Sequence, residues 1–251
     1  RKIAGFGIAS LEKDKERYEH KYEYCDLLVT GSGPAGLSSA YAAAKNGAKV
    51  ILAEDKPRFG GSLLTDDVTI DNLSGKAWTD KIITQLKEMP NVIVKNRSQV
   101  FGYYDHNMTV MIERTGDHLK DKPKYVPRQR LWYIRAKEVI LSTGSIERPI
   151  VFGNNDTPGV FLSAAAKEYI KVYGVLVGKK PLVFTNNDSG YETALEFKKH
   201  GIDPIILDTR EEHSSELIDS AKNQNIKIKF SYAVIAANGY KKVNSAQIGR
   251  L

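Results

Sequence analysis

Cysteine and long apolar runs are scarce in this sequence. Cys25 is the one cysteine among 251 residues, which excludes an internal disulfide framework, a redox-active cysteine pair and a zinc site made of cysteine alone. Such low cysteine usage fits a reducing compartment, and we expect a cytoplasmic protein. No uncharged apolar run approaches the ~18 residues of a membrane helix, so no membrane partner is expected. The five histidines show no metal-ligand spacing, and no metal site is predicted.

The charge balance is basic but carries no nucleic-acid signature. Lysine and arginine total 37 against 30 acidic residues, a net charge of +7. The basic residues are scattered and no ribonucleoprotein motif, zinc finger or zipper accompanies them, so a nucleic-acid partner is not expected. The length suits one large domain or two small ones. Because the chain starts at Arg1 and stops after a strand-like segment, we expect a piece of a longer protein.

A glycine-rich turn carries the strongest chemical signal. Residues 31–36 read Gly-Ser-Gly-Pro-Ala-Gly and fit the pattern G-x-G-x-x-G. The apolar run 25–30 predicts a strand before the turn, and the alanine-rich segment 35–46 predicts a helix after it. A second predicted strand, 49–53, leads into Glu54, which follows Gly31 by 23 residues and is close to the expected spacing of ~20. This order is that of a dinucleotide-binding βαβ unit.

The physical role of each position supports that interpretation. Gly31 permits the tight turn, Gly33 lets the backbone approach a pyrophosphate, and Gly36 lets helix and strand pack closely. The free N–H groups at the helix N-terminus attract phosphate. Glu54 can accept hydrogen bonds from a ribose diol, whereas a 2′-phosphate would meet the carboxylates of Glu54 and Asp55, which disfavours NADP.

Further candidates follow the same ligand path. The paired glycines after Arg58 let backbone run along a ligand, and a predicted buried strand ends at Thr143-Gly144. No residue is predicted to be catalytic. The predicted cofactor-binding residues are Gly31, Ser32, Gly33, Pro34, Ala35, Gly36, Glu54, Asp55, Arg58, Gly60, Gly61, Ser62, Val100, Thr143 and Gly144.

The order of elements repeats with an offset of about 150 residues. Predicted strands at 181–185 and 205–207 flank a predicted helix at 189–200, and a further helix and three strands follow. The repeat's turn, Thr185–Gly190, keeps only the last of the three glycines, and Asp188 would repel a pyrophosphate; Asp208 closes the next strand. We predict that this unit has lost nicotinamide binding. The predicted organisation is a charged linker or helix at 1–23, a first dinucleotide-binding domain at 24–151 and a second, inserted one at 152–251.

The glycine turn, Glu54, Gly60-Gly61 and residues 141–144 in this order resemble the two-dinucleotide-binding-domain flavoproteins. The resemblance implies an α/β class with an FAD/NAD(P)-binding Rossmann-like fold, in which a parallel sheet carries a β-meander and a second Rossmann-like domain is inserted. It also implies FAD, or occasionally NAD, at the first site. The closing segment of the first unit would follow the insert, beyond Leu251.

A closer resemblance, over about residues 26–249, is to the α (large) subunits of heterotetrameric sarcosine oxidase. Its most specific stretches are Arg130–Gly144, Glu147–Leu162 and Thr185–Ala194. The resemblance implies an oxidoreductase complex that demethylates sarcosine to glycine, reduces O2 to H2O2 and transfers the one-carbon unit to tetrahydrofolate. It implies NAD at the first site, FAD and covalent FMN elsewhere in the complex, partner β, γ and δ subunits, and an amine substrate handled by β. This chain would hold no complete active site, and we expect the isolated fragment to be inactive.

Two other interpretations stay open at this stage. One is a stand-alone FAD-dependent NADH oxidoreductase, with FAD at the first site and NADH at the second. The other is a structural assembly module whose pocket is empty. NAD and FAD share an adenosine ribose and a pyrophosphate, so the glycine turn and Glu54 suit either.

Overall fold

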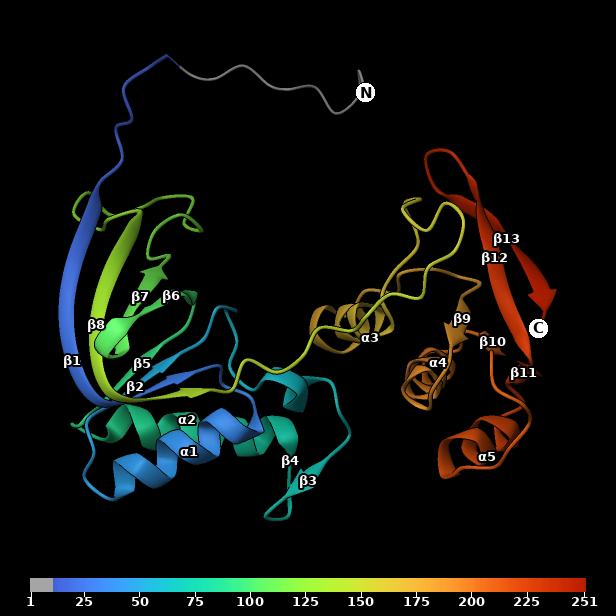
Figure 1. Ribbon diagram of the computed structural model, residues 1–251, viewed down its shortest axis with the longest axis horizontal. Coiled ribbons are helices and arrows are strands. Elements are labelled where there is room, and N and C mark those ends of the chain that lie inside the picture. The colour runs from blue at the N-terminus through green and yellow to red at the C-terminus, as the bar shows by residue number, and fades with distance from the viewer. Residues whose placement is uncertain (1–10) are drawn as a thin grey trace. The chain divides into compact units, whose positions relative to one another are not determined.

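The computed structural model describes residues 11–251, which form two compact units (Figure 1). The first unit comprises the chain as far as Leu63 together with Val68–Gly144, and the second comprises Leu64–Asp67 and Ser145–Leu251. The chain thus passes from the first unit to the second between residues 144 and 145. The boundary predicted from the sequence, between 151 and 152, lies further along the chain. Residues 1–10 of the predicted linker lie outside the described part.

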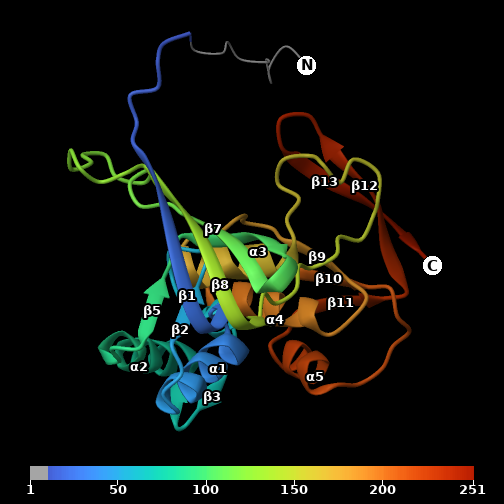
Figure 2. The same ribbon diagram turned by 60° about the vertical axis from the view of Figure 1, so that its left-hand side comes forward.

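The first unit is built on a sheet of order β5-β2-β1-β8-β7-β6. Strands β5, β2, β1 and β8 run parallel to one another, whereas β8, β7 and β6 form an antiparallel meander (Figure 2). The strands are β1 (Tyr18–Thr30), β2 (Val50–Ala53), β5 (Val92–Lys95), β6 (Ser98–Tyr104), β7 (Met108–Glu113) and β8 (Gln129–Leu141).

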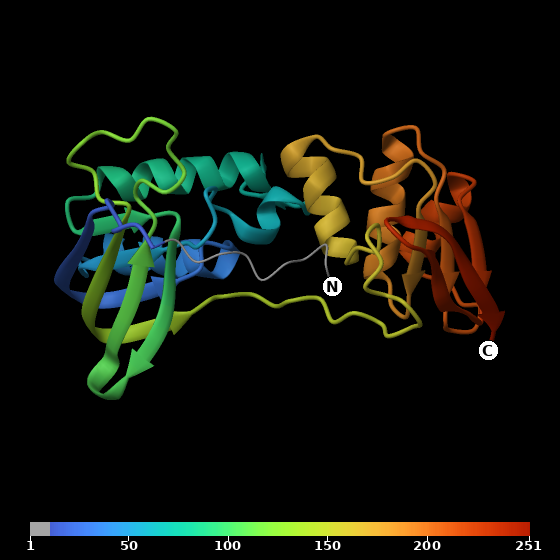
Figure 3. The same cartoon turned by 90° about the horizontal axis from the view of Figure 1, so that it is seen from above.

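Two helices, α1 (Pro34–Lys45) and α2 (Gly75–Glu88), cover one face of the parallel strands (Figure 1). Their apolar side chains pack with Leu27, Val29 and Leu52. The opposite sides of the same strands face the meander, where Leu28 packs with Met111 and Trp132 in a second core. The alternation of apolar side chains between two faces explains why short, wholly apolar strands lie at the centre. The meander and the 3-10 turn Asp105–Asn107 at its tip can be followed in Figure 3.

Strands β1 and β8 are both longer than the sequence led us to expect. Residues 18–23, predicted as part of a charged linker or helix, belong to β1. The sequence pattern predicts two strands, at 130–135 and 138–144, where the structure has one strand, β8. The two strands pair in parallel from Tyr18↔Gln129 to Thr30↔Leu141. Charged side chains on β1 find partners on β8: Glu19 Oε2 lies 3.0 Å from Arg130, and the Lys21 ammonium lies 4.3 Å from the Trp132 ring centre. These tertiary partners stabilise a strand whose own composition is polar.

The second unit has a three-stranded parallel sheet of order β11-β10-β9 and a separate antiparallel hairpin, β12–β13. Val183, Tyr191 and Ile206 belong to its core. Its elements are α3 (Ser163–Tyr173), β9 (Leu182–Thr185), α4 (Ser189–Lys199), β10 (Ile205–Asp208), α5 (Glu216–Asn223), β11 (Lys227–Phe230), β12 (Tyr232–Gly239) and β13 (Val243–Arg250). The β9–α4–β10 order repeats β1–α1–β2 of the first unit, and the predicted α/β class is confirmed.

Three short elements lie between β2 and α2: the 3-10 turn Gly61–Leu64, β3 (Thr69–Ile70) and β4 (Leu73–Ser74). Across residues 11–251, none of the helices combines the length and the apolar character needed to cross a membrane.

Candidate functional site

Two of the three glycines in the first turn are required by close packing. Gly31 follows β1 with φ of +99°, and a Cβ there would lie 2.3 Å from the backbone oxygen of Ser142 at the end of β8. A Cβ on Gly36 would lie 2.0 Å from the backbone oxygen of Gly31. A side chain at position 31 would therefore clash with the end of β8, and one at position 36 would push α1 away from the turn.

The middle glycine is different, because it faces open space. A Cβ at Gly33 would meet nothing within 4 Å, and its φ of −68° is one that any residue can adopt. Gly33 is the N-cap of α1, which has no side-chain hydrogen bond at the cap and no acidic residue in its first turn. The N-terminal N–H groups of the helix and its positive dipole end are therefore available to an anion. A bare glycine beside uncapped helix donors is the geometry that a pyrophosphate needs.

Ser32 connects this turn to the predicted ribose acceptor. Its backbone N–H and its hydroxyl donate to Oε2 of Glu54 at 2.9 and 2.6 Å, and the N–H of Lys56 donates to Oε1 at 3.0 Å. Glu54 is only 6% exposed, and burial raises the pKa of its carboxyl group. These hydrogen bonds fix the orientation of a carboxylate at the C-terminal end of β2, which is where a dinucleotide-binding unit presents its acidic residue.

The paired glycines lie against the same turn. The N–H of Gly60 donates to the hydroxyl and the carbonyl of Ser32, at 3.2 and 3.1 Å. Gly61 has φ of +54°, and a Cβ on it would lie 3.0 Å from the Cα of Gly33. The loop after β2 is thus held beside the helix N-terminus by backbone contacts, and glycine at these positions permits the close approach. Ser62 follows at an exposed position, as do Asp55 and Arg58 earlier in the loop.

The end of β8 completes the cluster. The Ser142 hydroxyl donates to the carbonyl oxygens of Thr30 and Gly31, at 2.9 and 3.0 Å. Thr143 and Gly144 are exposed, and Gly144 has φ of +69° with no atom within 4 Å of an added Cβ. Ser142 is not among the predicted site residues, although its place at a strand end, directly before Thr-Gly, could have indicated a role beside the turn. Its hydroxyl holds the first turn in place.

One predicted residue has a different environment. Val100 lies on β6, two residues beyond Ser98, whose N–H donates to the Glu54 carbonyl at 2.7 Å. Its side chain packs, partly buried, against the core between the parallel strands and the meander. This packing places Val100 in the core of the first unit, and its contact with a ligand remains a prediction.

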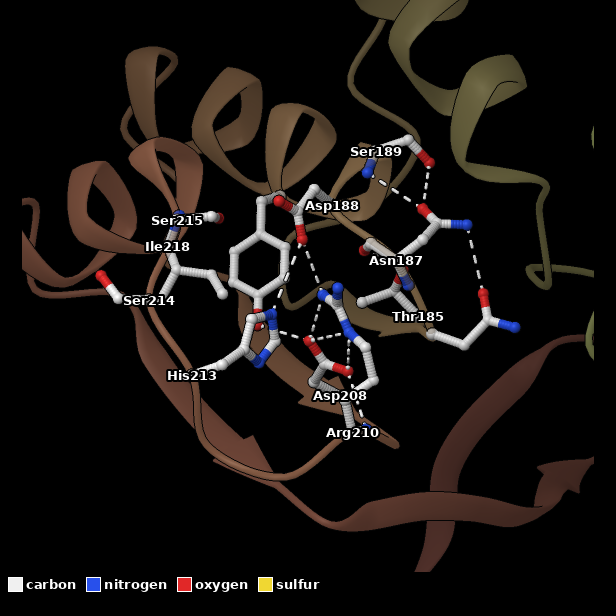
Figure 4. Close-up of polar contacts among 12 residues, drawn as sticks. Thr185, Asn187, Asp188, Ser189, Asp208, Arg210, His213, Ser214, Ser215 and Ile218 are labelled. Carbon is white, nitrogen blue, oxygen red and sulfur yellow. Dashed lines mark hydrogen bonds and ion pairs between the residues drawn. The ribbon is translucent and has the colours of Figure 1, made fainter.

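The corresponding turn of the second unit is closed by its own side chains (Figure 4). Thr185 stands where the first unit has Gly31; its hydroxyl donates to the Asn187 carbonyl at 2.8 Å and accepts from the Asn187 N–H at 3.2 Å. The Asn187 side-chain oxygen accepts from both the N–H and the hydroxyl of Ser189, at 3.0 and 2.6 Å. The first N–H of α4 is therefore already bonded.

The acidic residue of this unit, Asp208, also accepts hydrogen bonds from side chains of the same unit. Asp208 is fully buried, and Arg210 donates to its two oxygens through Nε at 3.0 Å and Nη2 at 2.7 Å (Figure 4). The Tyr191 hydroxyl donates to the same carboxylate at 2.8 Å, and Arg210 also reaches Asp188 at 2.8 Å. Despite the burial of Asp208, these hydrogen bonds hold the pKa of its carboxyl below the ordinary value.

Two Rossmann-like units in tandem, the first with an open glycine turn and a buried acidic residue, define a dinucleotide-binding protein of the two-unit type. The chain belongs to the pyridine nucleotide-disulphide oxidoreductase family, whose pattern it matches over residues 25–249.

Among proteins of known identity, the chain is similar to the sarcosine oxidase subunit alpha of Rhizobium meliloti (strain 1021), with 43% identity over 211 residues that make up 84% of this chain and 21% of the relative. It is 37% identical to the subunit of the same name from Corynebacterium sp. (strain U-96), over 85% of this chain and 22% of the relative. The predicted resemblance to these oxidoreductase subunits is confirmed. The chain spans about a fifth of the length of these curated relatives.

Solved structures share the fold. L-proline dehydrogenase from P. horikoshii matches with a TM-score of 0.63 at 21% identity, covering 96% of this chain and 42% of that one. Thioredoxin reductase from T. acidophilum matches with a TM-score of 0.65 at 16% identity, covering 90% of this chain and 71% of that one. At these identities the matches establish the arrangement of the backbone.

Proposed function

We propose that the first unit binds NAD, with its pyrophosphate at the N-terminus of α1 and its adenosine ribose at Glu54. The observation that carries this proposal is the space at Gly33, where a side chain would meet no protein atom within 4 Å, beside a helix end that has no side-chain cap. The residues that would hold the dinucleotide are those of the turn 31–36, Glu54, the Gly60–Gly61 loop with Ser62, and Thr143–Gly144. Asp55, Arg58 and Val100 are proposed as flanking contacts.

The chemistry of the acidic residue selects among dinucleotides. A carboxylate accepts hydrogen bonds from a ribose diol, and it repels a 2′-phosphate. Glu54 and the adjacent Asp55 therefore favour NAD over NADP. FAD presents the same adenosine ribose and pyrophosphate, and is the alternative ligand. The preference for NAD over FAD rests on the resemblance to sarcosine oxidase α subunits.

The work of this chain is to bind and orient rather than to catalyse. A bound nicotinamide or flavin would supply hydride-transfer chemistry. The chain supplies backbone N–H groups for the phosphates and a fixed carboxylate for the ribose. Cys25 is the one cysteine of these 251 residues, so they contain no cysteine pair that could exchange a disulfide. Its side chain is also buried.

We propose further that the full-length protein is the α subunit of a complex that oxidatively demethylates sarcosine, with one-carbon transfer to tetrahydrofolate. The 37–43% identity to sarcosine oxidase subunits supports this, because it extends over most of the chain. On this proposal the partners are β, γ and δ subunits, the amine substrate and FAD belong to β, and a covalent FMN lies elsewhere in the complex. Neither nucleic acid nor a membrane takes part, and the complex works in the cytoplasm.

Mass spectrometry of the small molecules released from each separated subunit tests the ligand. We expect NAD in the fraction that contains this chain. FAD in that fraction, with a flavin absorbance that NADH bleaches, would instead support a stand-alone NADH oxidoreductase. If the fraction holds neither ligand and calorimetry of the full-length protein detects no dinucleotide binding, the unit is a structural assembly module.

A further inference from the structure

We infer that the second unit binds no pyridine dinucleotide, because its own side chains occupy the hydrogen-bonding positions that the ligand would use. The family is named for pyridine nucleotides, and the second unit repeats the β–turn–helix–β order of the first. The two turns therefore allow a direct comparison within one chain. They differ at the helix donors, at the acidic residue and in charge.

The helix donors differ first. Neither helix has a hydrogen bond from its own N-cap side chain, but only α1 begins beside open space, at Gly33. At α4 the side-chain oxygen of Asn187 accepts from the first N–H of the helix. The Asn187 oxygen takes the Ser189 N–H and hydroxyl, and Asn187's own N–H is bonded to Thr185. A pyrophosphate at this helix would have to break hydrogen bonds that the protein already makes.

The last glycine of the turn is explained by packing alone. A Cβ on Gly190 would lie 2.7 Å from both the Cβ and the hydroxyl oxygen of Thr185. The larger residue at position 185 thus fills the space between β9 and α4, and it makes glycine obligatory at 190. The one glycine that the second turn keeps is the one whose role concerns helix–strand contact rather than ligand approach.

The carboxylate of the acidic residue, Asp208, is already hydrogen-bonded as well. Asp208 has no exposed surface, and Arg210 and Tyr191 bond to its carboxylate (Figure 4). A ribose diol would have to displace a charged guanidinium that is bonded to both oxygens, which is the stronger form of this interaction. In the first unit the donors to Glu54 are instead two backbone N–H groups and a serine hydroxyl, and the Asp55 side chain also contacts its carboxyl group.

The local charge opposes a phosphate. Asp188 is the N-cap residue of α4, so its carboxylate lies at the end of the helix where the pyrophosphate would bind. Arg210 joins Asp188 to Asp208, so one guanidinium serves two carboxylates. The ring Nε2 of His213 also faces Asp188, at 3.9 Å. This network ties the end of β10 to the start of α4, which is the connection that a bound dinucleotide would otherwise make.

Photolabelling of the full-length protein, with any subunits that copurify, tests the inference on unaltered residues. The probes are the 8-azidoadenine analogues of NAD and NADP, each used with and without excess unlabelled nucleotide, and the labelled peptides are mapped. We expect no competitor-sensitive label in residues 182–215. Competitor-sensitive label in that segment overturns the inference. Competitor-sensitive label in residues 26–64 would support the proposed function of the first unit, and its absence there would count against that proposal alone.

A titration with NADH provides the second measurement. The variant Asp208→Asn keeps the size of the side chain and removes the charge that a ribose-binding acid would need; Glu54→Gln is the matched change in the first unit. We expect Asp208→Asn to leave the number of NADH sites and their affinity unchanged, and Glu54→Gln to weaken binding at least tenfold. A site lost with Asp208→Asn in a protein whose circular dichroism is unchanged overturns the inference. If that variant does not fold, the photolabelling decides.

Discussion

The Ser32 hydroxyl donates a 2.6 Å hydrogen bond to Oε2 of Glu54, across 22 positions of sequence, and accepts one from the Gly60 N–H. One small side chain thus links three segments: the glycine turn, the end of β2 and the loop that follows. Both Ser32 and Glu54 are buried. The residue between the first two glycines of the motif therefore determines how the acidic residue is held.

Replacement of Ser32 tests this link. In Ser32→Ala, Glu54 loses a hydrogen bond of the charged type, which is worth about 1.5–3 kcal/mol, and we expect the affinity for NAD to fall at least tenfold. The discrimination between NAD and its 2′-deoxyadenosine analogue should fall with it, because Glu54 is the group that we propose contacts the ribose. Calorimetry on the full-length protein measures both. Ser39→Ala is the matched control, since Ser39 is half-buried and its hydroxyl donates to the carbonyl of Ala35 in its own helix. Equal weakening toward both ligands would contradict a role through Glu54.

The glycines of the turn should separate stability from binding. Gly33→Ala adds a methyl group in open space, so we expect a change in unfolding free energy within about 0.5 kcal/mol but at least tenfold weaker NAD binding. Gly36→Ala places its methyl group 2.0 Å from the Gly31 oxygen, and we expect it to destabilise the first unit by about 1–3 kcal/mol. Urea unfolding and calorimetry distinguish the two. Normal binding by Gly33→Ala would place the ligand elsewhere.

Arg210 should matter for stability rather than for binding. Its removal in Arg210→Ala leaves the fully buried Asp208 with Tyr191 as its remaining side-chain partner. Breaking a buried ion pair costs about 3–5 kcal/mol, and the lower end applies because the Arg210 side chain is 32% exposed. Arg210→Lys should rescue little, since an ammonium cannot bond both oxygens in the same geometry. Thermal unfolding followed by circular dichroism measures the effect; wild-type stability in Arg210→Ala would show the network to be dispensable.

Cys25 should be unreactive until the first unit unfolds. Burial in the core between sheet and meander raises the pKa of its thiol from 9.0 to about 12. The unfolded thiol ionises near pH 9 while the folded one stays neutral, so this contribution to stability is complete below pH 9 and is lost as the pH rises toward 12. A thiol reagent at pH 8 should modify Cys25 only after urea is added. Cys25→Ser should flatten the decline in stability over that pH range, and rapid modification without urea would contradict the burial.

Much of the fold could be predicted because local signals agreed with it. The apolar runs at 25–30 and 49–53 belong to β1 and β2, and the segment after the glycine turn forms α1, as expected. The first part of β1 could not be predicted. Residues such as Glu19 and Lys21 suit a strand only because Arg130 and Trp132 lie beside them on β8, more than 100 positions away.

The candidate site divides in the same way. Pattern and spacing alone identified the turn at 31–36, Glu54, Gly60–Gly61 and Thr143–Gly144, because a dinucleotide turn constrains residue type at each position. Sequence could not show that Ser32 and Ser142 are the side chains that bind these segments together, since neither hydroxyl's partner is close in sequence. It also could not show that Arg210 covers Asp208.

Glycine, proline and apolar periodicity act over a few residues, so the sequence alone predicted the class of fold, the glycine turn of the first unit and the altered turn of the second. The scarcity of cysteine likewise excluded disulfide exchange without any coordinates. What holds each acidic residue in place became visible only in the tertiary structure. Glu54 is held by neutral donors and Asp208 by a guanidinium, and that difference depends on side chains whose positions are set by packing, not by spacing along the chain.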